Sequence, residues 1–412
     1  MVVSASPAPD AATLLPADEP TRYIADDRQA LDAARQVANA AAPNAMLRDR
    51  QRQYPLQELA LFSQLGLGGI SVPRQYGGPG LSFATLAEVF RLISAVDPAL
   101  GQIPQNHFGL IQLLRDAASE SQKQRIFNAV LTGQRIGNGG PEKNSKHTLE
   151  MHTRLQPTTD GLRLNGDKFY STGALFAHLV AVKALDERQQ PVLTLIPSPA
   201  TGLEIVDDWS GIGQRTTASG TVRLRDVKVD PANVISLLPL AEKPTIQGAV
   251  SQLIQAAIDA GIAQGALDEA AQFIREHSRP WVDAGVDRNA DDPYILADVG
   301  RLSIELSAAN ALLRRAALTL DEVDRRPVTA ESAAAASIAV AEAKVLTTEV
   351  ALLTSEKLFE WSGSRATLAE HGLDRHWRNA RTHTLHDPVR WKYHAIGDYY
   401  LNGHFPARHS WI

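Results

Sequence analysis

The sequence predicts an α+β protein in which helical regions lie on both sides of a central antiparallel sandwich or barrel. The period of the apolar residues supports this order. They recur every three or four positions in the first and last parts of the chain, as on a buried helix face, and they alternate in the middle part, as on strands. The chain has 412 residues, which is too many for one ordinary core, so two or three domains are expected.

Composition narrows the class of protein. Apolar residues make up 44% and charged residues 21%, which is typical of a globular chain. The formal net charge is −5, so no nucleic-acid partner is expected. No apolar run is long enough to span a membrane, and no membrane partner is expected. The chain has no cysteine, which suits a reducing compartment and favours a cytoplasmic location.

The first half of the chain divides into an arm, a helical domain and the start of a β domain. Residues 1–23 are rich in proline and predict a disordered arm. Residues 24–135 are predicted to form an N-terminal helical domain, in which an apolar stripe over 56–65 stops at glycines. Residues 136–240 are predicted to form the β domain, because short alternating runs follow one another without intervening helices. Asn165-Gly166 predicts a hairpin turn between two of these runs.

Residues 241–412 are predicted to form a C-terminal helical bundle. Asp292-Pro293 has the pattern of a helix start, with a capping carboxylate followed by proline at the first helical position. Beyond it, apolar side chains step by three and four, as they do in two further helices of about 30 residues each. The stripe of the helix that starts at Pro293 consists of Val299, Leu302, Leu306, Ala309, Leu313, Ala316 and Leu320.

The pattern of histidines marks the first candidate for chemistry. Seven of the 12 histidines lie from His371 onward. His383 and His386 would share a face of a helix, with Asp387 beside them. The spacing leaves three interpretations open, namely a solvated polar helix end, a proton-handling cluster, or the beginning of a metal site. We expect no metal.

Two loops that join aromatic and hydroxyl groups are the second candidate. One spans residues 168–174 and the other residues 207–220. Their hydroxyl and main-chain N–H groups suit the polar edge of a flat heterocycle, and Trp209 suits its face. Ordinary strand ends followed by turns would have the same composition, so that interpretation stays open. The chain has no Gly-x-Gly-x-x-Gly after a strand, so a nicotinamide site of the common kind is not expected.

Five segments together resemble a known family. They are Val72-Pro-Arg-Gln-Tyr-Gly-Gly78, Gln105-Asn-His107, Lys168-Phe-Tyr-Ser-Thr-Gly-Ala174, Asp208-Trp-Ser-Gly211 and the tail from Asp374 to Pro388. In this order they resemble the acyl-CoA dehydrogenase superfamily, in its flavin monooxygenase branch. The pattern is most like that of SfnB-type sulfur-acquisition oxidoreductases and is similar to dibenzothiophene monooxygenase. The resemblance implies a C-terminal four-helix bundle and a homotetramer.

The resemblance also implies a flavin between the β domain and the bundle. Thr172 would hydrogen-bond the flavin ring and Trp209 would pack against it. Arginines would reach the flavin phosphate, from a neighbouring subunit, and a guanidinium fork suits that group. The remaining cofactor residues that it implies are Asn138, Tyr170, Thr217 and Ser219 for the polar wall and Arg279 and Arg365 for the phosphate.

Two departures from the dehydrogenase pattern favour a monooxygenase. His386-Asp387-Pro388 stands where dehydrogenases have a catalytic glutamate in Tyr-Glu-Gly. The segment from Phe359 to Gly363 replaces the glycine-rich loop that lets FAD approach, and Glu360 and Trp361 would crowd a dinucleotide. FMN is therefore expected and FAD is less favoured.

The expected function is a two-component monooxygenase that uses reduced FMN and O₂ to oxygenate a small organosulfur compound in sulfur acquisition. A separate NAD(P)H:flavin reductase would supply the reduced FMN. His383 and His386 would hold or deliver a proton, His107 would line the same cavity, and Thr172 would donate a hydrogen bond. The alternatives are an FAD-dependent acyl-CoA dehydrogenase with Asp387 as base, and a non-catalytic helical scaffold.

Overall fold

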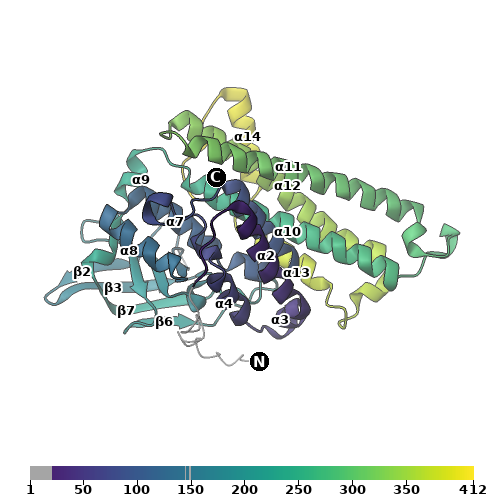
Figure 1. Ribbon diagram of the computed structural model, residues 1–412, viewed down its shortest axis with the longest axis horizontal. Coiled ribbons are helices and arrows are strands. Elements are labelled where there is room, and N and C mark those ends of the chain that lie inside the picture. Colours follow the sequence, from purple (N-terminus) through teal and green to yellow (C-terminus); the bar gives the residue numbers. More distant parts are fainter. Residues whose placement is uncertain (1–20, 144, 148–149) are drawn as a thin grey trace.

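The computed structural model describes residues 21–412 except 144, 148 and 149. The first 20 residues of the predicted arm lie outside this part. Helices come first, then strands, then helices again, and the long helices of the last part extend away from the sheet (Figure 1). The first helices are α2 (Asp27–Ala41), α3 (Ala45–Gln51), α4 (Leu56–Gln64), α5 (Phe83–Val96), α6 (Pro98–Gln102), α7 (Gln105–Ala117) and α8 (Glu120–Leu131).

The strands and the last helices follow in chain order. The strands are β1 (Ile136–Gly139), β2 (Arg154–Thr158), β3 (Gly161–Lys168), β4 (Leu179–Leu185), β5 (Pro191–Pro197), β6 (Leu203–Val206), β7 (Thr221–Val229) and β8 (Val234–Ser236). The last helices are α9 (Leu238–Glu242), α10 (Gln247–Glu276), α11 (Pro293–Asp324), α12 (Ala330–Ser362), α13 (Asp374–His383) and α14 (Arg390–Asn402). None of the described helices is long and apolar enough to cross a membrane.

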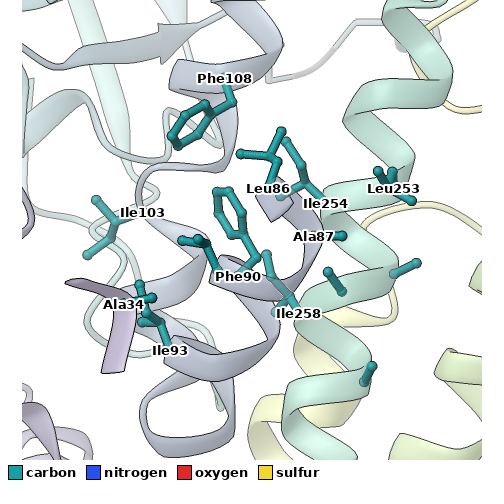
Figure 2. Close-up of a cluster of buried hydrophobic side chains, with 14 of the residues drawn as sticks. Ala34, Leu86, Ala87, Phe90, Ile93, Ile103, Phe108, Leu253, Ile254 and Ile258 are labelled. Carbon is teal, nitrogen blue, oxygen red and sulfur yellow. The ribbon is translucent and has the colours of Figure 1, made fainter. Parts of the chain in front are cut away.

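Helix α5 joins the first helical part to the bundle. Its Phe90 packs edge-on against Phe108 of α7, with ring centroids 5.4 Å apart. Figure 2 shows these rings beside Ile254 and Ile258 of α10. One apolar core therefore runs through both helical parts and holds the start of α10 in place.

The central sheet has the strand order β6-β7-β3-β2-β4-β5-β8, with β1 beside β4. Most neighbours are antiparallel, as expected from the alternating runs. The sheet also contains parallel pairings of β1 and β2 with β4, which the alternating pattern did not predict. Leu164, Val180, Val222 and Leu224 form a separate buried core on the sheet.

The hairpin turn predicted at Asn165-Gly166 is wrong. Strand β3 runs through both residues and the pairing with β7 shifts register between Leu164 and Gly166, which is a bulge. A Cβ atom at Gly166 would collide with Thr153, so glycine is needed here for a close approach of two backbones. The turn that joins β2 to β3 lies instead at Asp160.

The bundle agrees with the predicted helix lengths. Helices α10, α11 and α12 have 30, 32 and 33 residues. The Asp292 carboxylate caps α11 by accepting from the Tyr294 N–H at 2.8 Å, and Pro293 is its first residue. The predicted stripe of α11 is buried from Leu302 to Leu320.

Candidate active site

Three hydroxyl groups form a chain at the end of the sheet nearest the bundle. The Thr172 and Ser219 hydroxyls lie 2.6 Å apart, and Ser219 lies 2.8 Å from the Thr217 hydroxyl. Thr217 then donates to the Gln214 carbonyl at 2.9 Å. All three side chains are buried. The loop after β3 and the loop between β6 and β7 supply them, so the two segments predicted to meet do meet.

Aromatic groups stand beside this chain. The Trp209 indole N–H donates to the same Gln214 carbonyl at 2.9 Å. Its ring centroid lies 6.2 Å from that of Tyr170, in an edge-on arrangement, and Tyr170 is 55% exposed. Asn138 of β1 donates to the Tyr170 carbonyl at 3.3 Å. Six of the eight predicted cofactor residues thus form one surface, which we call the hydroxyl–aromatic wall: Asn138, Tyr170, Thr172, Trp209, Thr217 and Ser219.

Gln214, to which the sequence analysis assigned no role, lies against this wall through its main-chain carbonyl. Gln214 is only 3% exposed, yet neither polar atom of its side-chain amide has a hydrogen-bond partner among the described residues. The hydroxyl of the buried Ser171 is in the same state. Buried polar atoms without partners are rare, and such atoms beside an aromatic wall suit the polar edge of a bound heterocycle. The available signal was an amide directly after Gly211-Ile212-Gly213 in a loop already expected to face a ligand.

The wall sits where the sheet meets the bundle. The Gly213 N–H donates to the Thr382 hydroxyl at 3.0 Å, and the Gln214 N–H donates to the Asn379 amide oxygen at 2.6 Å. A Cβ atom on Gly213 would collide with the Arg378 carbonyl, so the loop lies directly against α13. The wall is therefore fixed to the helix that ends at His383.

His383 lies in a buried network of charged groups. Its Nδ1 is 2.5 Å from Asp259 Oδ1 and its Nε2 is 3.0 Å from Gln102 Oε1. The other Asp259 oxygen accepts from Lys344 at 2.6 Å and from Thr348 at 2.8 Å. Burial lowers the pKa of His383, against the effect of Asp259. For Asp259, burial acts to raise the pKa, but Lys344 and His383 outweigh it and lower the pKa to about 2.

These contacts leave His383 without a free ring nitrogen. Helix α13 ends at this residue, and His386 follows in a turn, so the two histidines do not share a helix face as expected. Proton delivery by His383 is therefore not what this arrangement supports. Its imidazole instead ties the end of α13 to α10 and α6.

His386 has the free nitrogen that His383 lacks. Its side chain is 34% exposed, and its Nδ1 lies 3.1 Å from Asp387 Oδ1. No described residue bonds Nε2 of His386. Burial acts to raise the pKa of Asp387, but the hydrogen bond with His386 and the charges of Lys344 and Lys392 outweigh it and hold that pKa below its ordinary value. A carboxylate that stays ionised orients the imidazole through Nδ1 and leaves Nε2 free.

Beside His386 lies a pocket of about 550 Å³, a size typical of small-molecule sites. Its walls come from the turn at 386–388, α14 and the segment 403–412, and half of the lining residues carry aromatic or imidazole rings. Those rings belong to His386, Trp391, His394, His404, Phe405, His409 and Trp411.

Three predicted site residues lie elsewhere. His107 is bonded through both ring nitrogens, to the Gly68 carbonyl at 2.8 Å and the Ile136 N–H at 3.1 Å, and burial lowers its pKa to about 4. It joins α7 to β1 and does not line the His386 pocket. Arg279 and Arg365 are exposed at the far end of the bundle, where Arg365 donates to the His277 carbonyl at 3.2 Å. From Asp259 to Glu276 helix α10 rises about 25 Å, so these arginines are remote from the wall of their own chain.

The structure also corrects the expectation for Trp361 and bears on the metal site that the histidine spacing left open. The Trp361 side chain is buried in the bundle and so would not crowd a dinucleotide as expected, whereas the Glu360 side chain is 63% exposed and pairs with Lys357 at 2.6 Å. Among residues 21–412, leaving aside 144, 148 and 149, no group of three or more His, Asp or Glu side chains could hold a metal ion.

Family models match two parts of the chain. Residues 25–134 match the model described as acyl-CoA dehydrogenase, N-terminal domain, and residues 253–391 match acyl-CoA dehydrogenase, C-terminal domain. The match covers the helices on both sides of the wall and ends within α14.

Individual relatives match nearly the whole chain. A dibenzothiophene monooxygenase of Rhodococcus erythropolis is 34% identical over 93% of this chain and 95% of its own length. A probable FMNH2-dependent monooxygenase, SfnC, of Pseudomonas putida is 31% identical over 92% of this chain and 96% of its own. The crystal structure of FMN-bound TdsC from Paenibacillus sp. A11-2 has a TM-score of 0.88 and 34% identity, covering 93% of this chain and all 100% of that one.

Proposed function

The chain belongs to the acyl-CoA dehydrogenase superfamily, in its flavin monooxygenase branch, and on that premise we propose that it oxygenates a small organosulfur compound with reduced FMN and O₂. The observation that carries the proposal is the arrangement of His386 and Asp387. Asp387, which stands where dehydrogenases have their catalytic glutamate, is paired with Lys392 and lies 3.1 Å from Nδ1 of His386, so the group left free at the pocket is an imidazole.

The residues present fit a flavin ring. The Trp209 and Tyr170 rings offer an apolar face, and the hydroxyl chain that runs from Gln214 through Thr217 and Ser219 ends at Thr172, whose oxygen is left to accept a hydrogen bond from one edge. The amide of Gln214 is buried without a partner and would bond the same edge. Bound reduced FMN would supply the electrons that activate O₂.

The chain's own residues would position the substrate and supply a proton. His386, with Nδ1 held by Asp387, would hold or deliver a proton through Nε2 at the mouth of the pocket. Thr172, whose hydroxyl proton is used toward Ser219, would hydrogen-bond the ring as an acceptor. The pocket rings would keep water from the reacting atoms, and the sulfur compound would occupy that pocket. His107 and His383 would act as structural supports, because their ring nitrogens are already engaged.

A homotetramer is part of the proposal. Arg279 and Arg365 are too far along the bundle to serve the wall of their own chain, so they would bind the phosphate of a flavin held by a neighbouring subunit. An exposed apolar face on α11 supports such packing, since Leu296, Ile304 and Leu318 are 57%, 71% and 51% exposed.

The remaining partners follow from what the chain would need. A separate NAD(P)H:flavin reductase would deliver reduced FMN, because the sequence carries no nicotinamide fingerprint of the common kind. The absence of cysteine supports a cytoplasmic location.

The same geometry argues against the dehydrogenase alternative. Asp387 is 3% exposed, is paired with Lys392 and His386, and has a pKa held below its ordinary value. Such a carboxylate is a weak base for removing a carbon-bound proton. The scaffold alternative leaves the unpartnered Gln214 amide unexplained.

A screen of small sulfur compounds tests the proposal. The protein would be supplied with reduced FMN and ¹⁸O₂, and each product would be weighed by mass spectrometry. Gain of one ¹⁸O atom in a sulfide, sulfone or sulfinate is the expected result. Desaturation of an acyl-CoA, or failure to bind either flavin, would establish one of the alternatives instead.

A further inference from the structure

Lys392, in the first turn of α14, is a buried cation with two partners. The residue is 1% exposed. Its Nζ lies 3.0 Å from Asp387 Oδ2 and donates to the main-chain carbonyl of Trp411. The other Asp387 oxygen lies 3.1 Å from Nδ1 of His386. One ammonium group therefore contacts both the carboxylate that orients His386 and the segment that walls the pocket.

That segment, residues 403–412, is held down at several points, and we call it the closing segment. Arg408 donates to the carbonyls of Ala241 and Lys243 at 2.9 and 2.7 Å. Gln252 donates to the Ser410 carbonyl at 3.2 Å. The segment also lies against the first turn of α10, where a Cβ atom on Gly248 would collide with the His409 carbonyl.

The contacts of Lys392 are interdependent for a physical reason. A buried ammonium group is unfavourable unless its N–H donors are satisfied and an anion is near. Loss of the Trp411 carbonyl would leave one donor without a partner, and Lys392 would then turn toward water and away from Asp387. Without that ammonium group, the Asp387 carboxylate would keep the more distant charge of Lys344 but lose its direct contact with Lys392, which holds it beside His386.

We infer that Lys392 is a positioning residue that couples docking of the closing segment to the orientation of the His386 imidazole. The conformation in which the closing segment forms the pocket wall is then the one in which the His386 imidazole is aligned. The catalytic meaning of this coupling rests on the proposed function, but the coupling itself is a property of the protein without flavin.

The first test changes Lys392. Lys392→Met keeps the length and removes the charge, and Lys392→Arg restores a cation. In the methionine variant, amides of residues 403–412 are expected to exchange with deuterium at least about tenfold faster. Nitrogen-15 spectra of the imidazoles, assigned with His386→Gln, are expected to change from one His386 tautomer to a mixture. The arginine variant should recover part of both signals.

The second test displaces the closing segment from outside the network. Gly248→Ala favours the helix but collides with the His409 carbonyl. Gly109→Ala is the matched control, because Gly109 lies within α7 and has nothing within 4 Å of an added Cβ. The Gly248 variant is expected to give the same His386 spectrum as Lys392→Met, and the control the wild-type spectrum.

Two results would overturn the inference. One is an unchanged His386 spectrum in a Gly248 variant whose closing segment exchanges faster. The other is wild-type protection of that segment in Lys392→Met. If the methionine variant does not fold, as judged by thermal unfolding, the Gly248 pair decides alone. Neither readout needs turnover, so these failures are distinct from a negative sulfur screen.

Discussion

His383 and Asp259 lie 124 positions apart in the chain, yet Nδ1 of one is 2.5 Å from Oδ1 of the other, and both side chains are almost inaccessible to solvent. The pair joins the end of α13 to the middle of α10. Because α13 also contacts the loop that carries Trp209, Thr217 and Ser219, this contact connects the stability of the bundle to the geometry of the site.

Asp259→Asn is expected to lower the free energy of unfolding by about 3–5 kcal/mol, because it leaves the Lys344 ammonium buried without an anion. Urea unfolding measures the change. The double variant Asp259→Asn, Lys344→Met should recover part of the loss. Asp268→Asn, on the exposed side of α10, serves as the control and should change stability little. A single variant as stable as wild type contradicts the prediction.

His386→Ala is expected to bind FMN with unchanged affinity but to release more hydrogen peroxide per O₂ consumed, because the proton-holding imidazole is lost. Oxygen uptake and peroxide are measured together with supplied reduced FMN. His152→Ala, whose side chain is 62% exposed, is the control. Peroxide release equal to that of wild type would remove His386 from the mechanism.

Thr172→Val keeps the shape of the side chain and removes the hydroxyl that contacts Ser219. Loss of one hydrogen bond to the flavin ring should weaken FMN binding about fivefold, corresponding to about 1 kcal/mol. Titration followed by flavin fluorescence measures it. Thr194→Val, buried in β5, removes a hydroxyl away from the wall and should leave FMN affinity unchanged.

Arg365→Ala is expected to weaken FMN binding about 10- to 100-fold, since a charge-assisted bond to phosphate contributes about 1.5–3 kcal/mol. Because the arginine would act on a neighbouring subunit, sedimentation should confirm that the variant keeps the assembly of the wild type. Arg35→Ala, an exposed ion-paired residue of α2, is the control. Equal affinities in variant and wild type would show that the phosphate lies elsewhere.

The free energy of unfolding is expected to fall as the pH drops from 6.5 to 4. Burial lowers the pKa of His107 to about 4, whereas in the unfolded chain it is near 6.5. Between these values the unfolded chain binds a proton that the folded one does not, which costs about 3 kcal/mol. His178, whose pKa burial also lowers to about 4, adds to the slope.

Urea unfolding at pH 7 and pH 4.5 measures this slope. His107→Gln should be less stable at pH 7 because the bond from the Ile136 N–H is lost, but its stability should depend less on pH. His404→Gln, with a side chain 70% exposed, should keep the wild-type slope. An equal slope in the His107 variant would contradict the assignment.

Periodic and capping patterns predicted the helices well because both are local. The α11 stripe and the Asp292-Pro293 start depend on neighbours within one or two turns. The turn at Asn165-Gly166 failed for the opposite reason. Its glycine meets a distant requirement, the close approach of Thr153, which outweighs the local turn preference.

The candidate site likewise has a part that was predictable from the sequence and a part that was not. Resemblance placed Thr172, Trp209 and Ser219 in one group, and they are in contact through Gln214 and Thr217. The sequence could not show that His383 has both nitrogens engaged, because its partners come from α10 and α6. The unpartnered amide of Gln214 is visible only once the loop is folded.

The close contact of Gly213 with the Arg378 carbonyl limits how the loop that follows β6 can be redesigned. Side chains of the loop that follows β6 can be exchanged to suit another ring or another edge. The glycine cannot, because any larger residue would lift the loop from α13 and carry Trp209 with it. When this loop is exchanged for that of a related protein, α13 should therefore be exchanged with it.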